Sequence, residues 1–318
     1  MISLATAIGA DIGHDLISLA VVRMKGEIIT RSEVRLNKKQ TRDSIVSVLT
    51  DAIREIRLKA AGQGINPICI GIAAKGFIDH SQGVILGPDQ GIKDWMSVPL
   101  ARLIGNGTGL PTYVGNDANM MTIAEHQFGA AKGLGNIVFV ALRTGIGGGL
   151  IINGKLYRGV NNAGGEIGQM IINYDNGISN LGIKGSFEHL ASASAVIRRF
   201  SEESGNVYEN KQISCREIFE LSYSGHSTAQ KVVKENAEIV GIGLANLISI
   251  FAPEMIILGG GMSQARDSYF DAIVKSAFEN SLVNCRAEVR IERAMQGHDA
   301  SLLGSAFYAL TRLAGKNI

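Results

Sequence analysis

The sequence predicts an α/β protein with two similar lobes and a cleft between them. A pattern of three strands, a helix and a further strand occurs twice, and short glycine runs directly follow several apolar stretches. A duplicated unit of this kind builds two lobes with separate cores, and 318 residues are enough for both. We expect residues 1–115 with 299–318 to form the first lobe and residues 116–298 to form the second.

Hydrophobic periodicity predicts the elements of the first copy. Between Ile45 and Ile56, apolar residues recur at the spacing of one helix face. Short β-branched runs indicate a three-strand meander and two later strands. The expected strands cover residues 7–12, 16–22, 27–30, 69–73 and 112–114.

The second copy shows the same order of patterns. Apolar runs predict strands at residues 137–142, 150–152, 155–157 and 255–258. Residues 230–251 carry an apolar face at helical spacing, and a last helix is expected from about residue 299 to 313. That last helix is apolar enough to pack back on the first lobe.

Composition excludes several classes of protein. Charged residues make up 19% of the chain and the net charge is +2, which argues against nucleic-acid and membrane partners. No apolar run is long enough to span a membrane, and no signal peptide opens the chain. Cys69, Cys215 and Cys285 are far apart and form no CxxC pair, so we expect a cytoplasmic protein without disulfides.

Two glycine-bearing turns follow the first strands of the two meanders. In "GADIGHD" (residues 9–15), Asp11 precedes Gly13 and could hold Mg²⁺ beside a phosphate, although a plain hairpin with a solvated Asp fits equally well. In "TGIGGG" (residues 144–149), a hydroxyl and unhindered backbone N–H groups favour a phosphate site. The predicted contacts of this second turn are Thr144, Gly145 and Gly147.

A third glycine run, "LGGGM" (residues 258–262), follows a buried strand. Gly259, Gly260 and Gly261 could hold the adenosine side of a nucleotide. The run does not fit GxGxxG with a downstream acid, so a Rossmann dinucleotide site is not expected.

The segment "GNDANMMTIAEHQFG" (residues 115–129) places Asn116 and Asp117 where a strand ends and a helix begins. A carboxylate at that position is commonly a helix N-cap. It could instead be the general base that takes a proton from a sugar hydroxyl as its oxygen attacks a γ-phosphate. Glu166 and Glu188 leave similar alternatives, because each could accept bonds from sugar hydroxyls or simply be exposed in a turn or helix.

Together these segments resemble the ROK family of bacterial repressors and sugar kinases, in the same order and over nearly the whole chain. The resemblance implies the actin-like ATPase fold (sugar kinase/Hsp70/actin, ribonuclease H-like), with ATP and Mg²⁺ as cofactors. It implies Asp117 as general base, and a hexose or N-acyl hexosamine as substrate. Homodimers are common in the family, so a homodimer is one assembly that the resemblance allows. The implied sugar contacts are Asn116, Asp117, Glu166, Gln169 and Glu188.

One departure from the family pattern concerns zinc. The family commonly has a His at the end of its "GEIGH" loop and three cysteines after it, which together bind a structural zinc. Here Gln169 stands at the position of the His, Ser186 stands at that of one Cys, and "NYDNGISNLGIKGSFE" contains no cysteine. Zinc needs thiolate or imidazole ligands, so we expect no zinc site.

A second departure lies in the first phosphate loop. The family usually reads Asp-x-Gly-Gly followed by Thr or Ser, whereas this chain has His14 and Asp15 after Gly13. An anion near phosphate is unfavourable, which puts ATP turnover in question. The alternative to a kinase is therefore a sugar sensor that kept the binding site and lost catalysis. Only ten residues precede Asp11, too few for the helix-turn-helix of the family's repressors, so we do not expect DNA binding.

Overall fold

A computed structural model describes residues 5–36, 40–87, 92–174, 177, 182–205 and 213–316. The chain divides into two compact units. The first unit comprises residues 1–133, 150–164 and 295–318, and the second comprises residues 134–149 and 165–294.

The sheet of the first unit begins as the expected meander. Strands β1 (Thr6–Ile12), β2 (Leu16–Arg23) and β3 (Ile28–Arg35) pair antiparallel, and β5 (Cys69–Ala74) and β9 (Thr112–Asn116) then join parallel to β1. The strand order is β3-β2-β1-β5-β9. Strand β3 extends five residues beyond the expected end at residue 30, because its pairing with β2 continues to Arg35.

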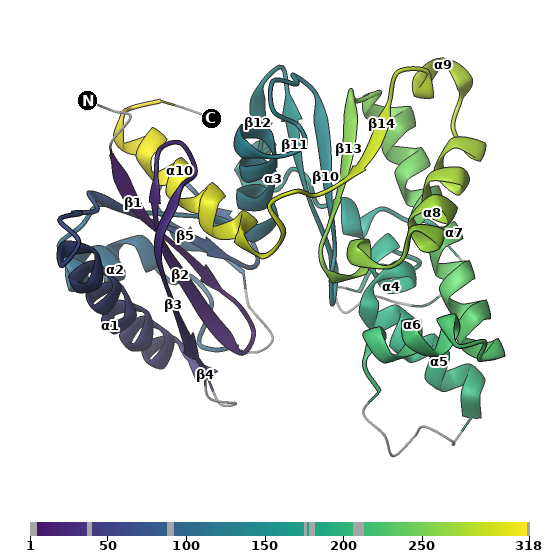
Figure 1. Cartoon of the computed structure of the whole chain (residues 1–318), viewed down its shortest axis with the longest axis horizontal. Helices are drawn as coiled ribbons and strands as arrows, with labels where there is room; N and C mark the ends of the chain where they lie inside the picture. The colour runs from purple at the N-terminus through teal and green to yellow at the C-terminus, as the bar shows by residue number, and fades with distance from the viewer. Residues whose placement is uncertain are drawn as a thin grey trace. The chain divides into compact units, whose positions relative to one another are not determined.

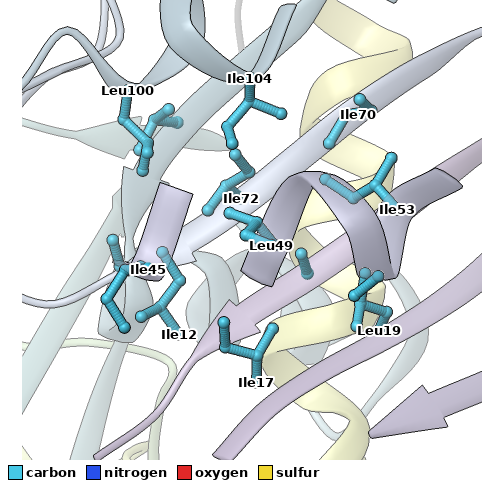
Figure 2. Packing of buried hydrophobic residues seen from close by; sticks show 14 of the residues in the cluster. Ile12, Ile17, Leu19, Ile45, Leu49, Ile53, Ile70, Ile72, Leu100 and Ile104 are labelled. Carbon is cyan, nitrogen blue, oxygen red and sulfur yellow. The ribbon is translucent and has the colours of Figure 1, made fainter. Parts of the chain in front are cut away.

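One face of this sheet is covered by α1 (Arg42–Ala61) and α2 (Leu100–Thr108). Side chains alternate along β1 and β5, so Ile8, Ile12 and Ile70 point toward these helices. Leu49 and Ile53 on α1 meet them in a closely packed core (Figure 2). The predicted apolar stripe of α1 is therefore confirmed as its core-facing side.

The opposite face of the sheet is covered by α10 (Ala300–Leu313), the yellow helix in Figure 1. A Cβ built on Gly9 would lie 2.2 Å from the Leu302 carbonyl oxygen, and one built on Gly71 would lie 1.9 Å from that of Ser305. The two glycines thus let the helix backbone approach β1 and β5 closely. This packing confirms that the last helix returns to the first sheet.

Gly71→Ala is expected to destabilise the protein by about 1–3 kcal/mol or more, because neither the strand nor the helix backbone can yield easily. Gly62→Ala is the matched control, since Gly62 has φ −60° and its nearest neighbouring atom would lie 3.5 Å from the added Cβ. Urea unfolding of both variants measures the difference. Equal unfolding midpoints for Gly71→Ala and the wild type would contradict the close contact.

The second sheet repeats the topology of the first. Its order is β12-β11-β10-β13-β14, with β10 (Ile137–Leu142), β11 (Ile146–Ile152), β12 (Lys155–Tyr157), β13 (Met255–Gly259) and β14 (Arg290–Arg293). Strands β13 and β14 run parallel to β10, as β5 and β9 do to β1. The predicted duplication is therefore confirmed at the level of strand order.

Helices of the second unit include the long α7 (Ser227–Phe251), which packs against α8 (Asp267–Glu279). Its other neighbours are shorter: α4 (Phe187–Ala191), α5 (Ala193–Ser204), α6 (Cys215–Tyr223) and α9 (Val283–Arg286). Two small ladders belong to the first unit, one between β4 (Gln40–Thr41) and β8 (Ile92–Lys93), and one between β6 (Ile78–Asp79) and β7 (Val84–Ile85).

The observed units differ from the expected lobes at residues 116–133, which include α3 (Asp117–Phe128), at residues 150–164 and at residues 295–298, all of which belong to the first unit. We expected the second lobe to begin at residue 116, but α3 packs on α10 within the first unit. The sequence carries no sign of this contact, because the two helices are far apart along the chain. Among the described residues, no helix has the length and apolar character needed to cross a membrane.

Candidate functional site

Asn116 and Asp117 lie at the junction of β9 and α3, as predicted. Asn116 is the N-cap: its Oδ1 accepts a hydrogen bond from the Asn119 backbone N–H at 3.1 Å, and its Nδ2 donates to the Gly76 carbonyl oxygen at 3.1 Å. The sequence left two roles open for Asp117, a helix N-cap or a general base. The structure shows that the N-cap of α3 is Asn116 and not Asp117. A single amide connects the helix start to the loop after β5.

Asp117 is the first residue of α3, and its Oδ1 accepts a hydrogen bond from the Ala118 backbone N–H at 2.9 Å. The first turn of a helix stabilises negative charge, because the N–H groups there have no partners in the helix. The location thus favours an ionised carboxylate, the form required of a general base.

Asp11 lies near the end of β1, at the same edge of the sheet as Asn116. Asp11 pairs with Ala73 across β1 and β5, and Ala74 pairs with Asn116 across β5 and β9. The carboxyl ends of parallel strands meet at one edge, which is the usual ligand site of such sheets. The Asp11 Oδ2 accepts a hydrogen bond from Ser301 Oγ at 2.7 Å, which fixes the carboxylate against the start of α10.

Gly13 closes the hairpin between β1 and β2, with its N–H donating to the Leu16 carbonyl oxygen at 2.9 Å. The side chains of His14 and Asp15 are 73% and 83% exposed and lie 2.8 Å apart, from His14 Nδ1 to Asp15 Oδ1. Gln40 Nε2 donates to the His14 carbonyl oxygen at 2.7 Å. The side chains of both His14 and Asp15 are therefore largely in solvent.

The glycine turn of the second unit is shorter than expected. Strand β11 begins at Ile146, so Gly147 lies in a strand and only Thr144 and Gly145 remain in the turn. The Ile146 N–H donates to Glu188 Oε2 at 2.9 Å, and a Cβ on Gly145 would lie 2.4 Å from that same oxygen. Gly145 therefore makes room for the Glu188 carboxylate beside the turn.

Gln169 and Glu188 lie together in the second unit. Gln169 Nε2 is 3.4 Å from Glu188 Oε1, while the buried Gln169 Oε1 has no hydrogen-bond partner. A buried polar atom without a partner costs about 1–3 kcal/mol unless a ligand or water satisfies it. The structure thus joins two predicted sugar contacts that are 19 residues apart in the chain and leaves an acceptor ready for a hydroxyl.

Glu166 lies in the turn before the short 3₁₀ helix Ile167–Gln169, and the Gln169 N–H donates to its carbonyl oxygen at 3.0 Å. Its side chain is exposed. The backbone turn therefore fixes the spacing of Glu166 and Gln169 on one loop of the second unit.

The third glycine run is divided between packing and open space. A Cβ on Gly260 would lie 2.3 Å from the Leu142 carbonyl oxygen, and one on Gly259 would lie 2.5 Å from the Phe139 ring. A Cβ on Gly261 would have no atom within 4 Å. Two of these glycines are thus explained by contacts of β13 with β10, and Gly261 alone leaves space for a ligand.

The predicted site residues form two groups, one in each unit. Asp11, Gly13, Asn116 and Asp117 belong to the first unit, and all the others belong to the second. Sequence reasoning missed Ser301, which holds Asp11, and Gly76, which holds Asn116. The signal for Ser301 was its place at the start of a predicted helix, where a hydroxyl is common, but nothing local links it to Asp11.

In the structure, the residues at the positions of the family's zinc ligands have other roles. Ser186, at the position of one family cysteine, is the N-cap of α4 and accepts from the His189 N–H at 3.3 Å. Backbone hydrogen bonds from Ile172 and Asn173 to the Gly185 carbonyl oxygen close the base of this segment. Residues 175–176 and 178–181 of the segment lie outside the described residues. At the two described positions, the amide of Gln169 and the hydroxyl of Ser186 stand in place of an imidazole and a thiolate, and neither is a ligand that structural zinc prefers.

We expect the purified protein to contain no stoichiometric zinc. Elemental analysis after dialysis against a weak chelator measures this directly. About one zinc per chain would contradict the prediction and would direct attention to His189 as a recruited ligand.

Comparisons with known proteins identify the family of the chain. A family model described as "ROK family" matches residues 7–312. The chain is 29% identical to a glucokinase from Thermotoga maritima over 97% of this chain and 98% of that protein. It is 28% identical to a xylose repressor from Caldicellulosiruptor bescii over 93% of this chain and 76% of the repressor.

Among solved structures, the chain resembles a ROK family glucokinase from Streptomyces griseus that was crystallised with glucose and AMPPNP. The TM-score is 0.81 at 31% identity, and the match covers 96% of this chain and 99% of that one. The likeness confirms the actin-like α/β fold class. Family match, relatives and structure all show that the chain belongs to the ROK family.

Proposed function

We propose that the protein is an ATP-dependent kinase that phosphorylates a hexose or an N-acyl hexosamine. The observation that carries this proposal is the pair of Gln169 and Glu188, in which a buried amide oxygen without a partner lies beside a carboxylate. Closely placed acceptors and donors of this kind suit the hydroxyl groups of a sugar. The glucokinase relatives and the complex of one with glucose and AMPPNP support the same reading.

In the proposed reaction, Asp117 accepts the proton of the attacking sugar hydroxyl. The sugar oxygen then forms a bond to the γ-phosphorus while the bond to the β,γ-bridging oxygen breaks, and ADP leaves. Asn116, Glu166, Gln169 and Glu188 would bind the other hydroxyls and orient the sugar. Because little covalent chemistry falls to the protein, positioning of the two substrates supplies most of the rate.

ATP is proposed to lie against backbone groups of the three glycine-bearing segments. Thr144, Gly145 and Gly147 are proposed to contact phosphates, and Gly261 is the member of its run with open space for the nucleotide. Asp11 is an oxygen ligand of the kind Mg²⁺ prefers, and it would hold the ion through water next to Gly13. When bound, Mg²⁺ neutralises charge on the phosphates.

A coupled ADP-release assay against a panel of hexoses and N-acyl hexosamines tests the proposal. We expect sugar-dependent ADP release above the rate of ATP hydrolysis without sugar. The second candidate function is a sugar sensor without catalytic activity, because one relative of the chain is a xylose repressor. Sugar binding by calorimetry with no phosphoryl transfer to any sugar of the panel would favour that sensor.

A further inference from the structure

A pocket lies in the first unit, beside the first turn of α3. It is small, with about 20 Å³ of space open to the centres of water-sized atoms, and it opens to solvent. Its walls come from the strand β6, the first turn of α3, the loop after β12 and the helix α10. Its polar lining comprises His80, Asn116, Asn119, Arg158, Asn162 and Tyr308.

Two arginines contact the ring of the buried Tyr308: Arg158, which lines the pocket, and Arg312, which is not part of the lining. The guanidinium carbon of Arg158 lies 5.6 Å from the centroid of the Tyr308 ring, and that of Arg312 lies 5.9 Å from the same centroid. Arg312 also lies 5.9 Å from the Tyr113 ring. Two cations at one ring repel each other, and a half-buried site weakens the screening by water. An anion bound at Arg158 would relieve that repulsion.

The pocket also contains polar atoms that lack partners. His80 Nδ1 and Asn119 Oδ1 are both buried without a hydrogen-bond partner. Burial above all, then the nearby charge of Arg158, lowers the pKa of His80, so the imidazole is neutral near pH 7. None of the residues that line the pocket is acidic. A ligand here would meet the positive charge of Arg158 together with neutral donors and acceptors.

Asn116 is the one residue that lines this pocket and is also a proposed sugar contact. Its side chain is occupied by the Gly76 carbonyl oxygen and the Asn119 N–H, and Asp117 is not part of the lining. No residue proposed to bind ATP lines the pocket. Apart from Asn116, the polar groups of the pocket therefore differ from those proposed to bind the sugar and ATP.

We propose that this pocket binds a small oxyanion, either inorganic phosphate or the phosphate group of a monoester, with Arg158 as its main ligand. Arginine presents several N–H donors in a planar arrangement that matches a phosphate. His80, Asn119 and Asn162 surround the remaining oxygens, and a protonated phosphate oxygen or an ester hydroxyl can donate to Asn119 Oδ1. Because the pocket adjoins the Asn116 cap, its occupant would stabilise the start of α3.

Isothermal titration calorimetry of the full chain at low ionic strength tests the proposal with inorganic phosphate and, separately, with glycerol 1-phosphate. We expect binding that Arg158→Gln weakens by about tenfold or more, because a charge-assisted hydrogen bond is lost. Arg216→Gln, an equal charge change at an exposed residue of the second unit, is the control and should leave the affinity unchanged. Tighter binding of the monoester would identify it as the natural source of the phosphate, and equal binding would favour the free ion.

His80→Leu provides a second variant that keeps both arginines. We expect His80→Leu to weaken phosphate binding, and its thermal unfolding midpoint shows whether the variant is folded. If Arg158→Gln does not fold, the affinity of His80→Leu for phosphate tests the proposal in its place. Asp117→Asn should bind phosphate like the wild type, so failure of the kinase proposal would not affect this one. No binding by the wild type, or equal affinity in the wild type and in both pocket variants, would overturn the proposal. The second result would place the phosphate at the ATP site.

Discussion

Asp117→Asn is expected to lower the rate of phosphoryl transfer by at least about 100-fold while sugar affinity changes little. The amide keeps the shape of the side chain and can still bond to a sugar hydroxyl, but it cannot take up the proton. Asn116 supplies the helix cap, so α3 should begin at the same residue in the variant. Loss of the negative charge in the first turn should cost only about 0.3–1 kcal/mol of stability.

The measurements are kcat by coupled assay, sugar affinity by calorimetry and stability by urea unfolding. Asp271→Asn, at an exposed residue of α8, is the matched control and should retain full activity. A variant at Asp117 that kept most of its kcat would mean that the base lies elsewhere. If instead kcat and stability fell together by large amounts, the role of Asp117 would be to support α3.

Glu188→Gln is expected to raise the sugar KM by about tenfold or more, since hydrogen bonds to a charged acceptor are worth about 1.5–3 kcal/mol. One carboxylate oxygen accepts from the Ile146 N–H, and the other is the one that faces Gln169. Only one oxygen remains in the variant, so the turn and the sugar compete for it. The KM for ATP should change much less than that for sugar.

A purely structural role would give a different result for Glu188→Gln. If Glu188 served only to hold the turn at Ile146, the unfolding midpoint would fall and the sugar KM of the folded fraction would stay the same. Glu220→Gln is the control, because Glu220 is an exposed residue of α6 whose contact with Arg266 is 3.8 Å long. A double change of Gln169→Leu and Glu188→Gln measures whether the two side chains act together, because the effects of residues in contact do not add.

Most of the secondary structure could be predicted because its causes are local. The apolar stripe from Ile45 to Ile56 and the β-branched run after Cys69 need only the spacing of side chains to indicate a helix and a buried strand. The strand ends were less accurate: β11 begins four residues before the expected Leu150, since glycine hides the alternation that marks a strand. Pairing with its neighbours decides where such a strand begins.

The candidate site was predictable as a set of residues but not as a set of contacts. Motif order indicated Asn116, Asp117, Gln169 and Glu188, and the structure joins the last two across 19 residues. The motif order did not indicate Ser301, whose hydroxyl donates to Asp11 although the two residues are 290 positions apart in the chain. Contacts over such separations depend on the packing of whole elements, which no local pattern records.

The sequence by itself determined the duplicated order of strands, the polar pair at the start of α3 and the absence of the family's zinc ligands, because each depends on residue type and spacing alone. Only the tertiary structure decided that Asn116 is the cap, that Gly71 and Gly260 are small for packing reasons, and that α3 belongs with α10. Each of these requires knowing which backbone lies within a few ångströms of which side chain. That proximity is set by how helices and sheets pack once the chain has folded.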